Sequence, residues 1–267
     1  MPSQNIRMVR LFCCAAVATG LYLFASFFKT PALADEGLST SPQMSTYAGF
    51  MLGAGHSSNE IVDIHGFSNW GHPGSKVKYS DRGLVGGVFA GQRTNFEGTN
   101  KRYEVEFMLT DLVSRSNRVD PRPIYGGDET VVTKYDWTLT ARFGVDKQID
   151  NVRFFVLGGP ALARIENSVT DVDWIREQKR YVYDPDDSFS SESTRFGWNL
   201  GIGFEKSIAS NWLIRLEGAV FDFGNETYQV NHAANDGCGS GGPKTPCATH
   251  KIDHRVSVLR LGFVYQF

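Results

Sequence analysis

The final residues of the chain, 254–267, constrain its fold more than any other stretch. They read HRVSVLRLGFVYQF, with a large apolar side chain at every second position and a partly polar set between them. Alternation with a period of two is typical of a β-strand that has one apolar and one polar face. The apolar set is Leu259, Leu261, Phe263, Tyr265 and Phe267.

A strand that alternates in this way and ends on an aromatic residue favours a membrane barrel, whose strands contact lipid on one face and a polar lumen on the other. The stretch also resembles the C-terminal signal by which bacterial outer-membrane barrels are recognised for assembly. That resemblance implies the barrel-assembly machinery as a partner during insertion. The signal residues would be Leu261, Phe263, Tyr265 and Phe267.

The first 34 residues have the layout of a secretory signal peptide. Two arginines precede an apolar run over 11–28, and Ala32-Leu33-Ala34 supplies a small-x-small cleavage site. The run is also long enough to be considered as an uncleaved anchor helix. The position of the cleavage site favours removal, which leaves a periplasmic linker over 35–45 and a barrel domain over 46–267.

Charge and hydropathy exclude two classes of protein. The formal net charge is −2, and the predicted leader contains three cations, Arg7, Arg10 and Lys29, and no carboxylate. The exported remainder is therefore acidic, which argues against a nucleic-acid partner. After residue 28 no apolar stretch approaches the roughly 20 residues of a membrane helix. A membrane protein of this composition must then be a closed barrel, because the backbone hydrogen bonds are otherwise unsatisfied in lipid.

Eight strands can be assigned along the chain. Most alternate clearly, whereas 83–93 contains paired glycines and 152–166 is nearly all apolar, so the facing of these two is ambiguous. In the first strand, glycines oppose large apolar residues, as expected where a narrow lumen is filled by bulky neighbours. The predicted strands are 46–56, 83–93, 102–110, 134–145, 152–166, 196–205, 212–223 and 254–267.

The connections between these strands alternate in length. Long polar segments follow the first, third, fifth and seventh strands, and short turns follow the others. Outer-membrane barrels place short turns in the periplasm and long loops outside. The fold class predicted is therefore an all-β, eight-stranded antiparallel up-and-down transmembrane barrel. Aromatic residues near the strand ends predict interfacial girdles: Tyr103, Tyr135, Trp198, Trp212, Tyr265 and Phe267.

Several stretches resemble a known family. The hairpin over 197–217, followed by Asp222-Phe223-Gly224, is similar to the sixth-to-seventh hairpin of OmpA-like, opacity-type surface barrels of alphaproteobacteria. Residues 155–161 (FVLGGPA) and 47–50 (YAGF) resemble the fifth and first strands of that family. The resemblance implies an abundant surface protein with porin-like, haem-binding or host-contact roles. The cysteine-bearing last loop and the long third loop depart from the family, so its loop-borne binding properties do not transfer directly.

Charged residues on the predicted inner face form a candidate site. Charges of both signs in a confined lumen should pair, because an unpaired buried charge is costly. Eight strands enclose a space that side chains just fill, which favours a closed core stiffened by ion pairs over a narrow solute path. The set is Arg102, Glu104, Glu106, Asp136, Arg142, Glu205, Arg215, Glu217 and Arg260.

The cysteines and histidines of the loops suggest two further features. Cys238 and Cys247 flank a Gly/Pro-rich segment, and in an exported chain this favours a disulfide over a metal pair. The histidines gather in or beside the first and last long loops, which a closed barrel brings together at its outer mouth. We therefore state the hypothesis of a haem or metal site at His56 and His254, against the simpler reading of exposed polar loops that happen to contain histidine.

A short string over 56–59, H-S-S-N, resembles the His/Ser motif of outer-membrane lipid A deacylases, but it lies in the first loop, whereas those enzymes have it late in the chain. A short motif outside its structural context is weak, so we expect no enzyme activity and no resident cofactor. The sequence predicts a Gram-negative outer-membrane surface protein, structural or porin-like. The alternative is a binder of haem, metal or a host ligand. Lipid and lipopolysaccharide are the partners expected in that membrane.

Overall fold

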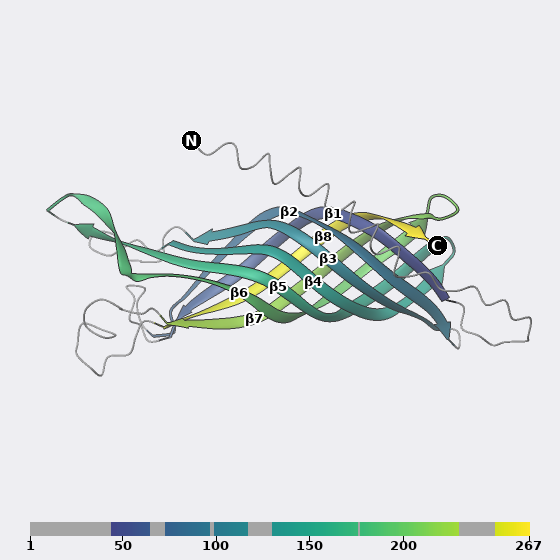
Figure 1. The fold of residues 1–267 in the computed structure, drawn as a ribbon, viewed down its shortest axis with the longest axis horizontal. Helices are drawn as coiled ribbons and strands as arrows, with labels where there is room; N and C mark the ends of the chain where they lie inside the picture. Colours follow the sequence, from purple (N-terminus) through teal and green to yellow (C-terminus); the bar gives the residue numbers. More distant parts are fainter. Residues whose placement is uncertain (1–43, 65–72, 97–98, 117–129, 176, 230–248) are drawn as a thin grey trace, which may run out of the picture. The chain divides into compact units, whose positions relative to one another are not determined.

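The chain folds into a closed antiparallel barrel of eight strands (Figure 1). The computed structural model describes residues 44–64, 73–96, 99–116, 130–175, 177–229 and 249–267. Each strand pairs with its neighbours in sequence, and the last pairs with the first. The strands are β1 (Met44–Asp63), β2 (Lys76–Phe96), β3 (Thr99–Ser116), β4 (Thr130–Ile149), β5 (Val152–Ile175), β6 (Arg180–Ser207), β7 (Trp212–Gln229) and β8 (Thr249–Gln266). The predicted fold class is confirmed.

The described residues include no helix of the length and apolarity that crossing a bilayer requires. The predicted leader and almost all of the predicted linker precede the described residues, and so are not tested. Cys238 and Cys247 also lie outside the part of the chain that the structure describes.

The strands extend beyond their predicted ends, most of all in the third long connection. Residues 167–194 were expected to form an irregular loop, and that prediction is wrong. Residues 167–175 continue β5 and residues 180–194 belong to β6 as the two strands of a hairpin, with Val172 opposite Tyr183 and Ile175 opposite Arg180. The hairpin projects past the other strands at the barrel end opposite the C-terminus (Figure 1). A strand with water on both faces has no apolar alternation, so its sequence looks like that of a loop.

The outer surface has a broad apolar band. On β6, Phe196, Trp198, Leu200, Ile202 and Phe204 all point outward, and Phe196 is 71% exposed. The same face of β8 carries Leu259 and Leu261, as the alternation predicts. Among the predicted girdle residues, Tyr103, Trp198, Trp212 and Phe267 are exposed on the outside. Tyr135 is an exception, because its side chain is buried inside the barrel.

Tyr135 faces inward because of a bulge in β4. The register between β4 and β5 shifts between Tyr135 and Thr138, and a β-bulge reverses which face the following side chains occupy. Residues before the bulge therefore follow the opposite parity to Thr138, Thr140 and Arg142. The register also shifts between Asp222 and Asn225 in β7, where Gly224 has a φ of +66°.

The lumen is filled by side chains in layers. Near the short turns an apolar cluster contains Tyr47, Met51 and Phe89, and two further clusters lie toward the long connections. Inward glycines make room for these rings: a Cβ on Gly49 would lie 2.5 Å from Phe89 Cζ, and one on Gly203 would lie 2.5 Å from Phe155 Cζ. Ring-over-glycine packing of this kind agrees with the small inner-face residues predicted from the sequence.

Candidate functional site in the barrel lumen

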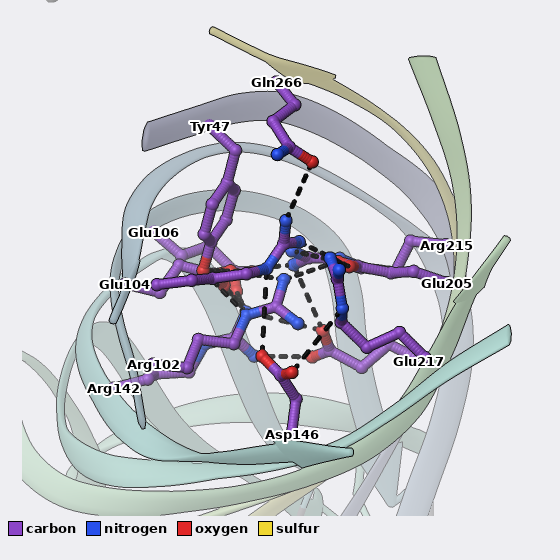
Figure 2. Close-up of polar contacts among 12 residues, drawn as sticks. Tyr47, Arg102, Glu104, Glu106, Arg142, Asp146, Glu205, Arg215, Glu217 and Gln266 are labelled. Atoms are coloured by element: carbon purple, nitrogen blue, oxygen red, sulfur yellow. Dashed lines mark hydrogen bonds and ion pairs between the residues drawn. The ribbon is translucent and has the colours of Figure 1, made fainter. Parts of the chain in front are cut away.

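A network of arginines and glutamates occupies the lumen in the half of the barrel nearest the short turns (Figure 2). Alternation on each strand turns these side chains inward, and each is at most 3% exposed. Strand β3 contributes three consecutive inward positions, and β4, β6, β7 and β8 contribute the rest. The members are Arg102, Glu104, Glu106, Arg142, Glu205, Arg215, Glu217 and Arg260.

Glu104 lies at the centre of the network. Arg215 Nη1 donates to Glu104 Oε2 at 2.9 Å, and Arg142 pairs with the other carboxylate oxygen. The Tyr47 hydroxyl also donates to Glu104 Oε2 at 3.0 Å, while Arg102 Nε donates to Tyr47 at 2.7 Å. One carboxylate therefore connects residues from β1, β3, β4 and β7, so its pairing holds distant strands in register.

The other carboxylates are shared between arginines in the same way. Glu217 Oε1 accepts from Arg260 Nη2 at 2.6 Å and also from Arg142. Arg142 Nη2 lies 2.8 Å from Glu106 Oε2. Glu205 accepts from Arg215 Nε at 2.9 Å and from Arg102. Because each charge has partners of opposite sign, the cost of removing it from water is offset by ion pairs and hydrogen bonds.

Aromatic rings complete the environment of the guanidinium groups. The Cζ atom of Arg215 lies 3.9 Å from the centroid of the Phe89 ring. The Cζ atom of Arg102 lies 4.5 Å from the centroid of Phe155, and that of Arg93 lies 4.3 Å from the centroid of Tyr47. Stacking of a guanidinium on a ring face stabilises a cation that water does not reach. The guanidinium groups are thus packed against aromatic rings on their faces and paired with carboxylates through their N–H groups.

Sequence reasoning missed three members of this layer. Arg93 on β2 donates to Glu205, and Arg153 Nε on β5 lies 3.5 Å from Asp146 Oδ1. Asp146 was assigned to a turn, yet it follows Arg142 and Gly144 on the inward parity of β4. Continuing the alternation by two more residues would have found it. Arg93 and Arg153 lie on the two strands whose facing the sequence left ambiguous.

Asp136 is a correction to the predicted set. Its side chain is on the outer surface, where Asp136 Oδ1 lies 2.7 Å from Lys134 Nζ and Oδ2 lies 3.7 Å from Arg164 Nε. The cause is the bulge between Tyr135 and Thr138, which reverses the parity just before the inward run of β4. Asp136 is therefore not part of the lumen network.

A polar cavity of about 130 Å³ opens at the end of the barrel that has the short turns. It is lined by Gln148, Asn151, Arg153, Glu205, Ser207, Ser210, Leu213 and Gln266. Its floor belongs to the charged layer, since Glu205 pairs with Arg102 and Arg215 beneath it. Arg102, Arg142, Arg215 and Arg260 have at most 2% of their surface exposed, so water does not occupy the lumen at that level.

The structure does not bring His56 and His254 together. His56 points outward, and its Nδ1 lies 3.1 Å from the carbonyl oxygen of Asp81. His254 is fully buried in the lumen, with its ring in edge contact with Tyr135 and its Nε2 3.4 Å from Asn167 Nδ2. The two imidazoles are on opposite faces of the barrel wall. Within the described residues, no group of three or more His, Cys, Asp or Glu side chains is arranged to hold a metal ion.

Burial changes the protonation of two histidines that lie beyond the apolar band. Desolvation, with the nearby charge of Arg195, lowers the pKa of His254 to about 3. Desolvation also lowers the pKa of His250 to about 4, and the negative charge of Asp63 opposes that shift only in part. Both rings are therefore neutral at physiological pH, because a buried imidazolium is poorly solvated.

The H-S-S-N string is divided between the two faces of β1. Ser57 points into the lumen, where its hydroxyl bonds to that of Ser114, whereas His56 points outward. Asn59 also faces inward and accepts from the Tyr135 hydroxyl at 2.5 Å. Neighbouring residues of a strand face opposite sides, so Ser57 and Asn59 lie inside the barrel, while His56 and Ser58 share its outer face.

Comparison with known proteins finds similar solved structures but no relative in sequence. No family model and no curated protein sequence matches the chain. Neisserial surface protein A matches with 12% identity and a TM-score of 0.30, over 82% of this chain and 97% of its own. The outer membrane protein OprG from Pseudomonas aeruginosa matches with 14% identity and a TM-score of 0.42, over 82% and 95%. The outer membrane protease OmpT from Escherichia coli matches with 11% identity and a TM-score of 0.31, over 87% and 99%.

Proposed function

We propose that this chain is a Gram-negative outer-membrane barrel that works as a structural surface protein, with its lumen closed by the arginine–glutamate network. The observation that carries the proposal is the outward apolar band. Leu84, Ile202, Leu52 and Leu259 are each more than 60% exposed. A contiguous apolar surface of this extent is unfavourable in water but is what a lipid bilayer solvates.

The dimensions of the band fit a bilayer. On β6 the outward apolar residues run from Phe196 to Phe204, and Thr194 and Lys206 bound them. That length matches the roughly 9–11 residues that a tilted transmembrane strand needs. Aromatic side chains lie at the edge of the band near the short turns. The ring centroids of Trp212 and Tyr265 are 5.1 Å apart, and those of Tyr265 and Phe267 are also 5.1 Å apart. Interfacial rings of this kind are typical of membrane barrels.

The closed lumen favours a structural role over a porin. Ion conduction needs a continuous path of water, and the buried guanidinium groups leave none at the level of Glu104 and Glu217. The proposed route of biogenesis is export by a cleaved signal peptide over 1–34 and insertion by the barrel-assembly machinery, which would recognise β8. The OmpA-like, opacity-type family remains the proposed relationship.

Three measurements test this function. Sucrose-gradient fractionation should recover the protein with the outer membrane, and the unheated protein should migrate differently from the boiled protein on a gel. Planar bilayers that contain the purified protein should show no steady conductance above the lipid background. Recovery as a folded, monodisperse protein in detergent-free buffer would overturn the membrane placement. Stable single-channel steps would overturn the closed lumen and favour the porin.

A further inference from the structure

A basic patch lies on the outer surface of the barrel, directly beyond the apolar band on β2, β1 and β8. We propose that it binds the phosphate groups of a phosphorylated glycolipid in the outer leaflet, an inference that rests on the membrane placement proposed above. The patch consists of Arg82, His56, Arg255, Ser58, Ser80 and Ser257, all of which are exposed.

Strand register brings these side chains together. His56 on β1 is paired with Arg82 on β2 and with Ser257 on β8. Two residues farther from the short turns, Ser58 is paired with Ser80 and Arg255. Residues two apart on a strand share a face, so these six side chains form two adjacent rows on the outside of the barrel.

The next row toward the short turns is apolar. Ala54 is paired with Leu84 and Leu259, and the two leucines are 74% and 61% exposed. The basic patch therefore begins where the apolar surface ends. In a membrane this is the level of the lipid headgroups, where arginine can keep its stem against apolar groups while its guanidinium reaches a phosphate.

Arg82 is the residue most available to a ligand. None of the described residues forms an ion pair with Arg82. Among the described residues Arg255 forms one ion pair, with its Nε 3.3 Å from Asp222 Oδ2, and its side chain remains 70% exposed. One strand separates the two arginines, which lie in adjacent rows, so their backbones are roughly 12 Å apart across β1. Two side chains at that separation can reach one phosphate group between them.

The residue types of the patch suit a phosphate. A guanidinium binds phosphate oxygens through parallel N–H donors, and it gives up its hydration more readily than an ammonium group. The serine hydroxyls between the arginines add donors without adding negative charge. The nearest carboxylate on β1, Glu60, lies one row farther out and is occupied by Lys76 Nζ at 2.8 Å.

The corresponding level on β4, β5 and β6 differs, which argues that the basic patch is specific. There Lys134 pairs with Asp136 at 2.7 Å and Arg164 pairs with Glu192 at 2.5 Å, while Glu166 adds a third carboxylate. These cations are already neutralised by the chain itself. Lys134 and Arg164 therefore provide a matched control at the same height on the barrel.

The test compares three proteins purified from outer membranes in mild detergent: the wild type, R82S/R255S and K134S/R164S. Each is titrated with bisphosphorylated lipid A, and native mass spectrometry measures the bound fraction. We expect R82S/R255S to lose about thirtyfold in affinity, because each cation near a charged headgroup adds about fivefold. K134S/R164S should bind as the wild type does, and dephosphorylated lipid A should bind each protein weakly.

Equal affinity of the wild type and R82S/R255S would overturn the site, as would equal binding of dephosphorylated lipid A or of phosphatidylglycerol. If R82S/R255S lacks the heat-modifiable band of the folded barrel, R82S alone is used, since Arg82 holds no described partner. Fractionation separates this outcome from failure of the proposed function. Wild-type protein that is absent from the outer membrane contradicts the function, whereas membrane-inserted variants with unchanged lipid A affinity contradict only the site.

Discussion

Arg215 Nη1 lies 2.9 Å from Glu104 Oε2, although the two residues are 111 positions apart in the chain and come from strands on different sides of the barrel. Their contact crosses the lumen and does not follow the wall. It links β3 to β7, which share no backbone hydrogen-bond ladder. Cross-lumen pairs of this kind make the charged layer a structural element in its own right.

Removing the central carboxylate should destabilise the barrel strongly. Glu104→Gln leaves Arg142 and Arg215 without a shared anion in a layer that water does not reach. Breaking one side of a buried ion pair typically costs about 3–5 kcal/mol. Chemical unfolding in detergent micelles measures the change. The control is Asp136→Asn, on the outer surface, which should cost less than about 1 kcal/mol; equal effects would contradict the layer's role.

A charge placed in the middle of the apolar band should impair the barrel more than a charge at its border. Ile202→Arg would set a cation against lipid hydrocarbon, at a cost of about 2–4 kcal/mol, whereas Thr194→Arg on the same face of β6 should cost about 1 kcal/mol or less. Folding titrations in lipid vesicles give both values. Similar small costs for the two substitutions would indicate that lipid does not contact this band.

Acid should destabilise the end of the barrel near the long connections through its buried histidines. The pKa of His254 is lowered to about 3 and that of His250 to about 4. The unfolded chain, with an ordinary histidine pKa near 6.5, binds more protons, so stability is complete above that pH and is lost as the pH falls toward the folded values. At pH 5 each histidine should cost about 2 kcal/mol.

The measurement is the unfolding free energy between pH 7 and pH 5, compared in the wild type, His254→Gln and His56→Gln. We expect His254→Gln to remove about half of the pH dependence, because the buried His250 remains, and His56→Gln, a change on the outer surface, to leave it as it is. A wild-type stability that stays constant across this interval would show that the buried rings do not resist protonation.

The lumen should stay closed unless the charged layer is thinned. In planar bilayers the wild type should give no steady current, since Arg142, Glu217 and their neighbours fill the cross-section. Replacing that pair together, as Arg142→Ser with Glu217→Ser, keeps the charge balance and removes side-chain volume. We expect small cation or anion currents from this variant. A silent double variant would mean that other layers are sufficient to close the lumen.

Alternation in the sequence predicted the barrel because one side of each strand within the band is apolar. It failed where the backbone changes parity. The bulge beside Tyr135 places that ring inside the barrel and Asp136 outside. The residue types around it do not predict a bulge at this position. On β5 the lumen-facing positions are themselves apolar, including Leu157 and Ile165, so both faces read alike. Contacts across the lumen depend on all the registers at once, and no single strand contains that information.

The ladder between β1 and β8 has a consequence for biosynthesis. The first strand finds its second partner only when β8 is present, because Tyr47 is paired with Gln266 and Phe50 with Phe263. Native pairings between strands so far apart in sequence form slowly, and strand edges that are still unpaired are prone to aggregate. A nascent chain of this protein therefore cannot close its barrel before β8 has been synthesised.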